Sequence, residues 1–151
     1  MYDSNNLVDC LLGIMFNKQT KIIMDNKFFV SLKAARLLKE KGYNEECDYC
    51  FYYDDYNDKW DFDYPHNLFD DEPMHYNNET IDYEMYSMPT KAEAIDWLES
   101  KGVYISIYYK IDRYHYNVEY KKEHFRIEVC GSRETRLEAE EAAIIKALTL
   151  L

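Results

Sequence analysis

The chain has 151 residues, with 29 acidic and 18 basic side chains and a formal net charge of −11. This charge argues against nonspecific binding to DNA or to anionic membranes, since both surfaces would repel the protein. Hydrophobic residues make up 47% of the chain, and it contains only 4 Gly and 3 Pro. A disordered or low-complexity chain is therefore excluded, and one ordinary domain with its own core is expected.

Residues 1–30 are expected to be an N-terminal extension or a short helix, outside a main domain of residues 31–151. The apolar run from Leu11 to Phe16 is interrupted by Gly13 and is far shorter than the roughly 20 apolar residues that span a bilayer. No positively charged region precedes this run, so it is not interpreted as an export signal. The four cysteines are accordingly expected to be reduced thiols in a cytoplasmic protein.

Three helices are predicted from their start and stop signals. Ser31 is a candidate N-cap for a helix that ends before Gly42. Thr90 and Glu93 have the spacing of a capping box, in which each side chain satisfies a backbone N–H of the other residue. A second capping box at Thr135 opens a helix that continues to the C-terminus.

Between these helices, apolar residues alternate with polar ones at a period of two. The strands predicted from this alternation lie at about 49–53, 60–64, 81–85, 103–109, 114–120 and 124–129. Such alternation is typical of antiparallel sheets with one solvated face. The predicted fold class is α+β, in the order helix, three strands, helix, three strands, helix, with antiparallel meanders packed against the helices.

The two halves of this domain, residues 31–89 and residues 90–151, share a short sequence pattern. Leu38–Tyr43 reads LKEKGY, and Leu98–Tyr104 reads LESKGVY. An internal duplication of a helix-plus-meander unit would explain the likeness. Two helices that each stop at Gly before a strand would explain it equally well. The sequence leaves both explanations open.

Nearly all of the acidic excess lies in residues 31–89, which carry fifteen acidic and five basic side chains. Residues 43–86 also contain nine tyrosines. Tyrosine supplies contact area at a modest entropic cost, and acidic rims steer basic partners. The candidate residues for binding a basic protein partner are Asp54, Asp55, Asp58, Asp61, Asp63, Asp70, Asp71 and Glu72. The simpler alternative is that this charge only keeps the protein soluble.

Two patterns suggest metal binding, and each has a simpler structural interpretation. Cys47 and Cys50 have the spacing of half a zinc site, but no second pair of ligands follows, so buried thiols are expected. The stretch from Asp54 to Asp63 lacks the Gly and the final Glu of an EF-hand loop and fits a solvated hairpin. The histidines also lack a metal-binding spacing, at positions 66, 75, 115 and 124. No cofactor, metal or catalytic residue is predicted.

Residues 90–151 have the element order of a double-stranded-RNA-binding domain, and residues 140–148 are similar to the Ala-rich last helix of that family. Affinity for RNA depends mostly on neutralised phosphates. Here Arg133 and Arg136 are accompanied by several glutamates at the start of the last helix. RNA binding is therefore kept as an alternative.

Three segments carry a resemblance to a known group of proteins: Ser31–Tyr43, Tyr86–Glu99 and Glu138–Leu148. In these segments the chain resembles small uncharacterised proteins that are encoded by phages and prophages of gut Bacteroides-type bacteria. The likeness covers about residues 31–151. It implies an accessory role in the bacterial cytoplasm and transfers no activity.

The leading hypothesis is a non-enzymatic, phage-type accessory protein that binds a host or phage protein through its acidic, Tyr-rich surface. An alternative is a binder of a small molecule or nucleotide, and even a weak enzyme. That alternative places a Tyr-lined pocket between the sheet and the loop at residues 65–80, which is longer than most connections in compact domains.

Overall fold

The computed structural model describes residues 26–63, 77, 85–122 and 124–151, and the statements below concern these residues. In chain order, the elements are η1 (Asn26–Phe28), α2 (Leu32–Glu40), β1 (Cys50–Asp54), β2 (Lys59–Asp63), β3 (Met85–Ser87), α3 (Lys91–Ser100), β4 (Val103–Lys110), β5 (Arg113–Lys122), β6 (Phe125–Arg133) and α4 (Arg136–Leu150). The predicted α+β class and the predicted order of helices and strands are both confirmed.

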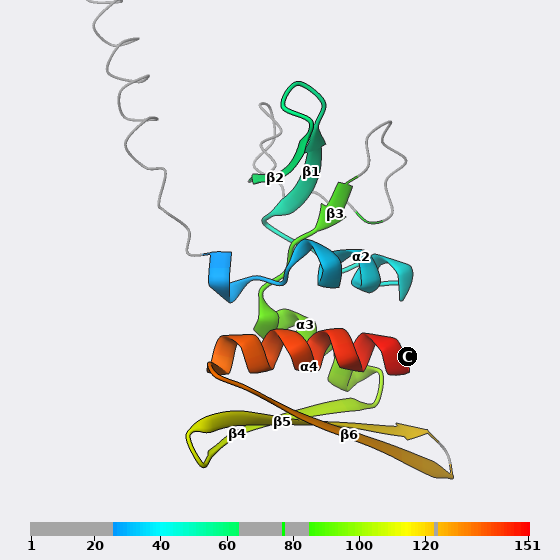
Figure 1. Ribbon diagram of the computed structural model, residues 1–151. Helices are drawn as coiled ribbons and strands as arrows, with labels where there is room; N and C mark the ends of the chain where they lie inside the picture. Colours follow the sequence, from blue (N-terminus) through cyan, green and yellow to red (C-terminus); the bar gives the residue numbers. More distant parts are fainter. Residues whose placement is uncertain (1–25, 64–76, 78–84, 123) are drawn as a thin grey trace, which may run out of the picture.

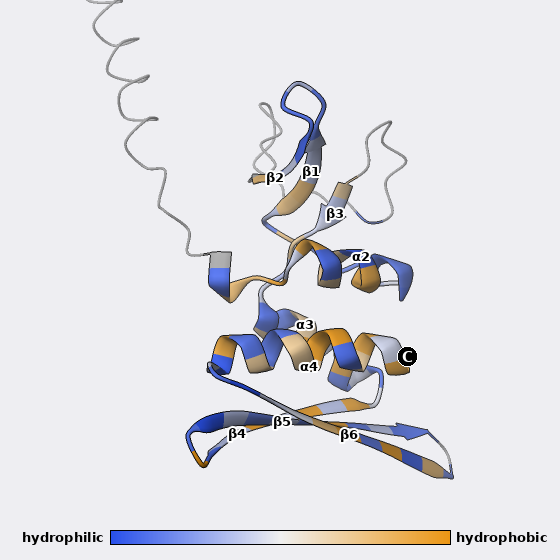
Figure 2. Cartoon of the chain, viewed as in Figure 1, coloured by the Kyte–Doolittle hydropathy of each residue, from blue (hydrophilic) through white to orange (hydrophobic). Residues whose placement is uncertain are grey.

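The molecule is built in layers around α4 (Figure 1). The sheet of β4, β5 and β6 lies on one side of α3 and α4, and α2 packs against the other side of α4. The sheet of β1, β2 and β3 lies beyond α2. Hydrophobic residues are spread along α4, and they alternate with hydrophilic ones along the second sheet (Figure 2). The buried residues of α4 are Ala139, Ala143, Ile144, Ala147 and Leu148, and the small side chains of the alanines allow neighbouring elements to pack closely.

The helix boundaries follow from local chemistry, as predicted. Ser31 Oγ accepts a hydrogen bond from the N–H of Ala34 at 3.3 Å, and both predicted capping boxes are present at α3 and α4. Gly42 and Gly102 follow the ends of α2 and α3 with φ values of 85° and 81°. Only glycine adopts this left-handed conformation without strain, which explains why the helices end there.

The second sheet is the predicted antiparallel meander, with the order β4-β5-β6. Val103 and Val118 are buried on the face that packs against the helices, whereas Tyr104 and Tyr108 are exposed on the other face. Tyr116 on β5 lies directly opposite Gly131 on β6. This sheet therefore has one apolar and one solvated face, as its sequence period indicates.

The first sheet is not the predicted meander. β1 is its central strand, with β2 and β3 antiparallel on either side, so its order is β2-β1-β3. A meander needs a short turn between consecutive strands, whereas residues 64–84 separate β2 from β3 and can cross to the far edge of β1. Of the strand predicted at residues 81–85, residues 81–84 lie outside the described residues, and Met85 begins β3. The two sheets differ in strand order, and a simple duplication does not account for that difference.

The packed part of the chain begins before residue 31. Phe29 forms a β-bridge with Thr90, and the N–H of buried Val30 donates to the carbonyl of Pro89 at 3.1 Å. Residues 1–25, where a short helix was one expectation, lie outside the described residues. No helix in the described part of the chain is long and apolar enough to cross a membrane.

Candidate functional site: a groove along α4

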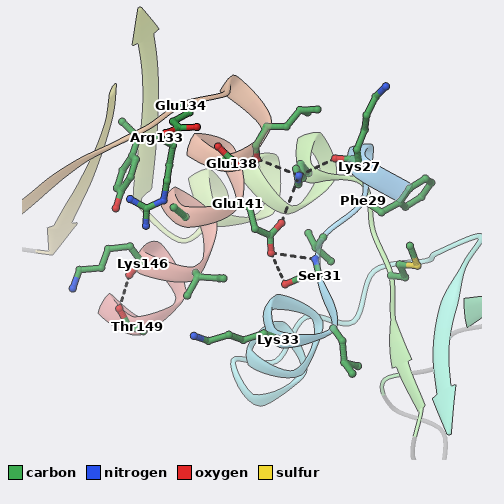
Figure 3. A pocket seen from close by; sticks show the side chains of 18 of the residues that line it. Lys27, Phe29, Ser31, Lys33, Arg133, Glu134, Glu138, Glu141, Lys146 and Thr149 are labelled. Atoms are coloured by element: carbon green, nitrogen blue, oxygen red, sulfur yellow. Dashed lines mark hydrogen bonds and ion pairs between the residues drawn. The ribbon is translucent and has the colours of Figure 1, made fainter. Parts of the chain in front are cut away.

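A groove of about 1240 Å³ runs along one flank of α4 (Figure 3). Residues 27–33, which lead into α2, form one wall, and the ends of β5 and β6 form the other. The first sheet contributes Phe51 and Phe62. Met88 and Lys91 also line it, so the groove is assembled from separate parts of the chain, with α4 as its base.

The base of the groove is apolar. Leu137, Ala142 and Ile145 lie along this flank of α4 and are only partly buried. The rings of Phe51 and Phe62 contact each other edge to face, with centroids 6.4 Å apart. A ligand that covers these side chains would remove apolar surface from water, which favours binding.

The charges around the groove are mainly positive, although the chain as a whole carries −11. The cationic lining residues are Lys27, Lys33, Lys91, Arg113, Arg133 and Lys146. The acidic lining residues are Glu134, Glu138 and Glu141. The charge of the groove lining is therefore opposite in sign to the net charge of the chain.

Lys91 and Glu141 have a structural role at one side of the groove. The ammonium of Lys91 donates to the carbonyls of Lys27 at 2.8 Å and Leu137 at 3.2 Å, and it lies 3.7 Å from Glu141 Oε2. Glu141 Oε1 accepts from the N–H of Ser31 at 3.1 Å and from its hydroxyl at 2.5 Å (Figure 3). This pair joins α2, α3 and α4, so its charges are already compensated.

The remaining cations are better placed for a ligand. Lys33, Arg113 and Lys146 are exposed, and no ion pair holds any of them within the described residues. The guanidinium of Arg133 lies 6.0 Å from the ring centroid of Tyr116. Glu138 accepts a hydrogen bond in the capping box of α4 and Glu134 is exposed on the rim, so two carboxylates remain beside these cations, which outnumber them.

Two of the candidate acidic residues build the turn between β1 and β2. Asp54 accepts hydrogen bonds from the side chain of Asn57 at 2.6 Å and from the N–H of Tyr56 at 3.0 Å. The hydrogen bonds from Asn57 lower the pKa of Asp54 below its usual value. Asp58 adopts a left-handed conformation with φ of 51° and accepts a hydrogen bond from the Tyr53 hydroxyl. These two carboxylates therefore stabilise a local turn.

Three of the other candidate acidic residues lie in the described part of the β1–β2 hairpin. Asp61 pairs with Lys59 at 3.1 Å, on the face of β2 opposite the side chain of Phe62. Asp63 lies opposite Cys50 at the end of the β1–β2 ladder, and Asp55 is exposed in the turn. Outside the described residues lie Asp70, Asp71 and Glu72.

Most described aromatic residues of the acidic half are packed within the protein. The Trp60 ring centroid lies 5.5 Å from that of Tyr53 and 5.4 Å from that of Tyr86. The guanidinium of Arg36 on α2 lies 4.8 Å from the Trp60 centroid and covers this group. Tyr56, at the tip of the turn, is fully exposed. Among the described tyrosines of this half, Tyr56 is therefore the one that is open to solvent, and the others are buried or partly buried.

Cys47 and Cys50 are buried thiols, as predicted. The Cys47 sulfur lies 3.6 Å from the Tyr43 hydroxyl. Burial raises the pKa of Cys47 to about 11, and burial also raises the pKa of Tyr43. A thiol with a raised pKa is mostly protonated at neutral pH and is a poor nucleophile or metal ligand. Among the described residues, no three His, Cys, Asp or Glu side chains are grouped to hold a metal ion.

His115 has local contacts within the second sheet. Its ring stacks on Tyr108 with centroids 5.5 Å apart, and its Nε2 lies 3.1 Å from the carbonyl oxygen of Lys110. His124 is exposed between β5 and β6. The two other histidines lie outside the described residues, at positions 66 and 75.

The start of α4, which carries the RNA-binding alternative, offers few free positive charges. Arg136 Nε donates to Glu140 Oε1 at 2.9 Å, and Glu138 caps the helix. The side of α4 that faces away from the second sheet packs against α2. This arrangement gives phosphates little at the helix start beyond Arg133.

Reasoning from the sequence missed the groove. Its cations lie between Lys27 and Lys146, so no local cluster indicates them. One signal was present in α4, where Ala142 and Ile145 extend the apolar surface beyond the stripe through Leu137, Ile144 and Leu148. A helix with apolar residues outside its buried stripe contacts something further.

Comparisons with known proteins found no match among family models, curated proteins or solved structures. The resemblance to phage-encoded proteins, and the accessory role that it implies, therefore remain predictions.

Proposed function

We propose that this protein is a non-enzymatic binding protein, and that the groove along α4 holds an acidic, amphipathic segment of a protein partner. The observation that carries the proposal is an apolar base between cationic walls in a chain of net charge −11. An accessory role, as the resemblance to phage-encoded proteins implies, agrees with a protein that acts by binding.

The dimensions of the groove favour a polypeptide over a small molecule. Pockets for small ligands usually enclose about 300–1000 Å³ and bury most of the ligand. This groove measures about 1240 Å³ and follows the flank of α4. Grooves of this type accept a helix or an extended segment that presents apolar side chains on one face.

Charge supports an acidic partner segment. Lys33 extends from α2 and Lys146 from α4 (Figure 3), and Arg113 lies at the β5 wall. Carboxylates of the partner would meet these ammonium and guanidinium groups, while its apolar side chains would cover Ile145. Because these cations are exposed, binding is expected to weaken as the salt concentration rises.

Two labelled peptides of the same length test this proposal. One alternates Leu and Phe with Glu, and the other replaces each Glu by Lys. We expect the acidic peptide to bind the full chain at least about tenfold more tightly at low salt, by fluorescence anisotropy. The variant with both Lys33→Glu and Lys146→Glu should lose this preference.

The matched control is Lys122→Glu, an exposed position at the end of β5 outside the groove. It changes the net charge without changing the groove, so the preference for the acidic peptide should remain. Equal binding of the two peptides, or unchanged binding by the double variant, would contradict the proposal.

A second candidate surface is the tip of the β1–β2 hairpin. It would bind a basic protein partner, as the acidic charge of residues 31–89 suggests. The observation in its favour is that Asp55 and Tyr56 are exposed on a turn that Asp54 holds in place. Tyrosine is enriched among the residues that contribute most to protein interfaces. Here the basic peptide should bind, and the variant with Asp55→Lys and Tyr56→Ala should bind it less. Unchanged binding would contradict this second candidate.

A further inference from the structure

β6 forms an edge of the second sheet. It pairs with β5 along its nine residues, and no strand in the described part of the chain pairs with its outer side. An open strand of this length presents a row of unpaired N–H and C=O groups, which can pair with another strand. Short edge strands and inward-pointing charges are usual protections, and β6 has neither along its first half.

The first half of β6 also exposes apolar side chains. Phe125 is 57% exposed and Ile127 is 38% exposed. Side chains alternate along a strand, so both point to the same face as Val129, which is partly buried. The end of the β5–β6 hairpin lies past the C-terminal end of α4, which leaves this face uncovered by that helix (Figure 1).

The opposite face of this segment is self-complementary in charge. Arg126 and Glu128 are two residues apart and about half exposed. They form an ion pair with each other at 3.4 Å, and Arg126 also lies 2.8 Å from Glu119 Oε2. If a second copy of β6 pairs antiparallel with its centre at Ile127, Arg126 of each copy lies opposite Glu128 of the other. Phe125 then lies opposite Val129 of the second copy. Both faces of the paired strands are thus matched, apolar with apolar and positive with negative.

Neighbouring registers are unfavourable. A centre at Arg126 places two arginines opposite each other, and a centre at Glu128 places two glutamates opposite each other. A register that pairs odd with even positions would set apolar side chains against charged ones, because side chains alternate between the faces. Charge and periodicity together therefore select the centre at Ile127.

We propose that two copies of this chain associate through their β6 edges, antiparallel and centred on Ile127, into one continuous six-stranded sheet. This interface lies outside the groove along α4 and does not depend on the proposed function. The occupant is a second copy, because Arg126 and Glu128 complement themselves under two-fold symmetry.

Sedimentation velocity across a concentration series tests the association. We expect a reversible monomer–dimer equilibrium that weakens at high salt. Arg126→Glu and Glu128→Arg should each weaken the dimer by about tenfold, because each creates two like-charge pairs. The variant that carries both changes should recover the dimer. A monomer at all concentrations, or single variants that dimerise as the original chain does, would overturn the proposal.

Disulfide formation tests the register separately. In a chain with Cys10→Ser and Cys130→Ser, Ile127→Cys should form an interchain disulfide under mild oxidation, since the two cysteines lie opposite each other. Val129→Cys in the same background is the matched control, because its opposite residue is Phe125. Equal crosslinking of the two variants would overturn the proposed register. Circular dichroism checks that each variant is folded.

Discussion

Tyr116 and Gly131 face each other across β5 and β6, and the tyrosine ring lies over the glycine. A Cβ built on Gly131 would lie 2.3 Å from the ring Cζ, which is far inside contact distance. The ring also lines the groove near Arg133. The absence of a side chain at Gly131 therefore sets the position of a ring that contributes to both the core and the site.

Gly131→Ala is expected to lower the free energy of unfolding by about 1–3 kcal/mol, because the new methyl group forces the Tyr116 ring to move. Urea denaturation measures this change. Tyr116→Ala should remove the clash, so the double variant should be more stable than the sum of the two single changes predicts. Strict additivity would show that the ring and the glycine do not interact.

Cys47 gives the stability of the protein a dependence on alkaline pH. Burial raises the pKa of the folded thiol to about 11 from a reference of 9.0. Below pH 9 the thiol is protonated in both states, so its contribution is fully present. As the pH rises from about 9 to about 11, the unfolded chain loses this proton more easily than the folded one, and stability falls.

We expect Cys47→Ala to reduce the loss of stability between pH 9 and pH 11. Part of the loss should remain in this variant, because burial also raises the pKa of Tyr43. Urea denaturation at several pH values in this interval measures the slope. Cys130→Ala, at an exposed position, is the control and should leave the slope unchanged. Equal slopes for the original chain and the Cys47 variant would contradict this explanation.

At the scale of elements, each of the three described α-helices begins at an N-cap residue. The three caps differ in which residues their side chains contact. Thr90 and Thr135 complete local capping boxes. The Ser31 side chain caps α2 and also donates to Glu141 on α4. A single hydroxyl therefore begins one helix and attaches it to another.

Ser31→Ala is expected to cost more stability than Thr135→Ala. Loss of a cap alone costs about 1 kcal/mol, and Ser31→Ala also removes a hydrogen bond to a partly buried carboxylate. Thermal or urea denaturation of the two variants gives the comparison. Equal losses would mean that the contact between Ser31 and Glu141 adds nothing to the cap.

At the scale of the whole molecule, the ion pair of Lys91 and Glu141 connects the layers. Lys91 lies at the start of α3, is only 8% exposed, and bonds to backbone of η1 and α4. Glu141 extends the connection to α2. The pair stabilises the arrangement that gives the groove its two walls.

Lys91→Ala is expected to lower the free energy of unfolding by about 3 kcal/mol, because it leaves Glu141 without its cation and two carbonyls without a donor. Arg136 is exposed and pairs with the partly buried Glu140, and Arg136→Ala should cost less, about 1 kcal/mol. Denaturation of Lys91→Ala and Arg136→Ala gives this comparison, and denaturation of Lys91→Ala, Glu141→Ala and the double variant measures the coupling between Lys91 and Glu141. Similar costs for Lys91→Ala and Arg136→Ala would contradict the structural role.

The sequence by itself determined the features that depend on neighbours along the chain. The caps at Ser31, Thr90 and Thr135 act within one helical turn, and the strand period of two reflects alternating side chains, so both could be recognised locally. The buried thiols of Cys47 and Cys50 were predicted in the same way, from the absence of a second ligand pair.

Only the tertiary structure decided which elements meet. The order β2-β1-β3 depends on how the chain returns after a long connection, and strand alternation is the same in either order. The acidic residues Asp54 and Asp58 found partners within their own turn, which composition does not reveal. The groove combines cations from Lys27 to Lys146. Such distant residues come together through packing of separate layers, and no local pattern in the sequence records that packing.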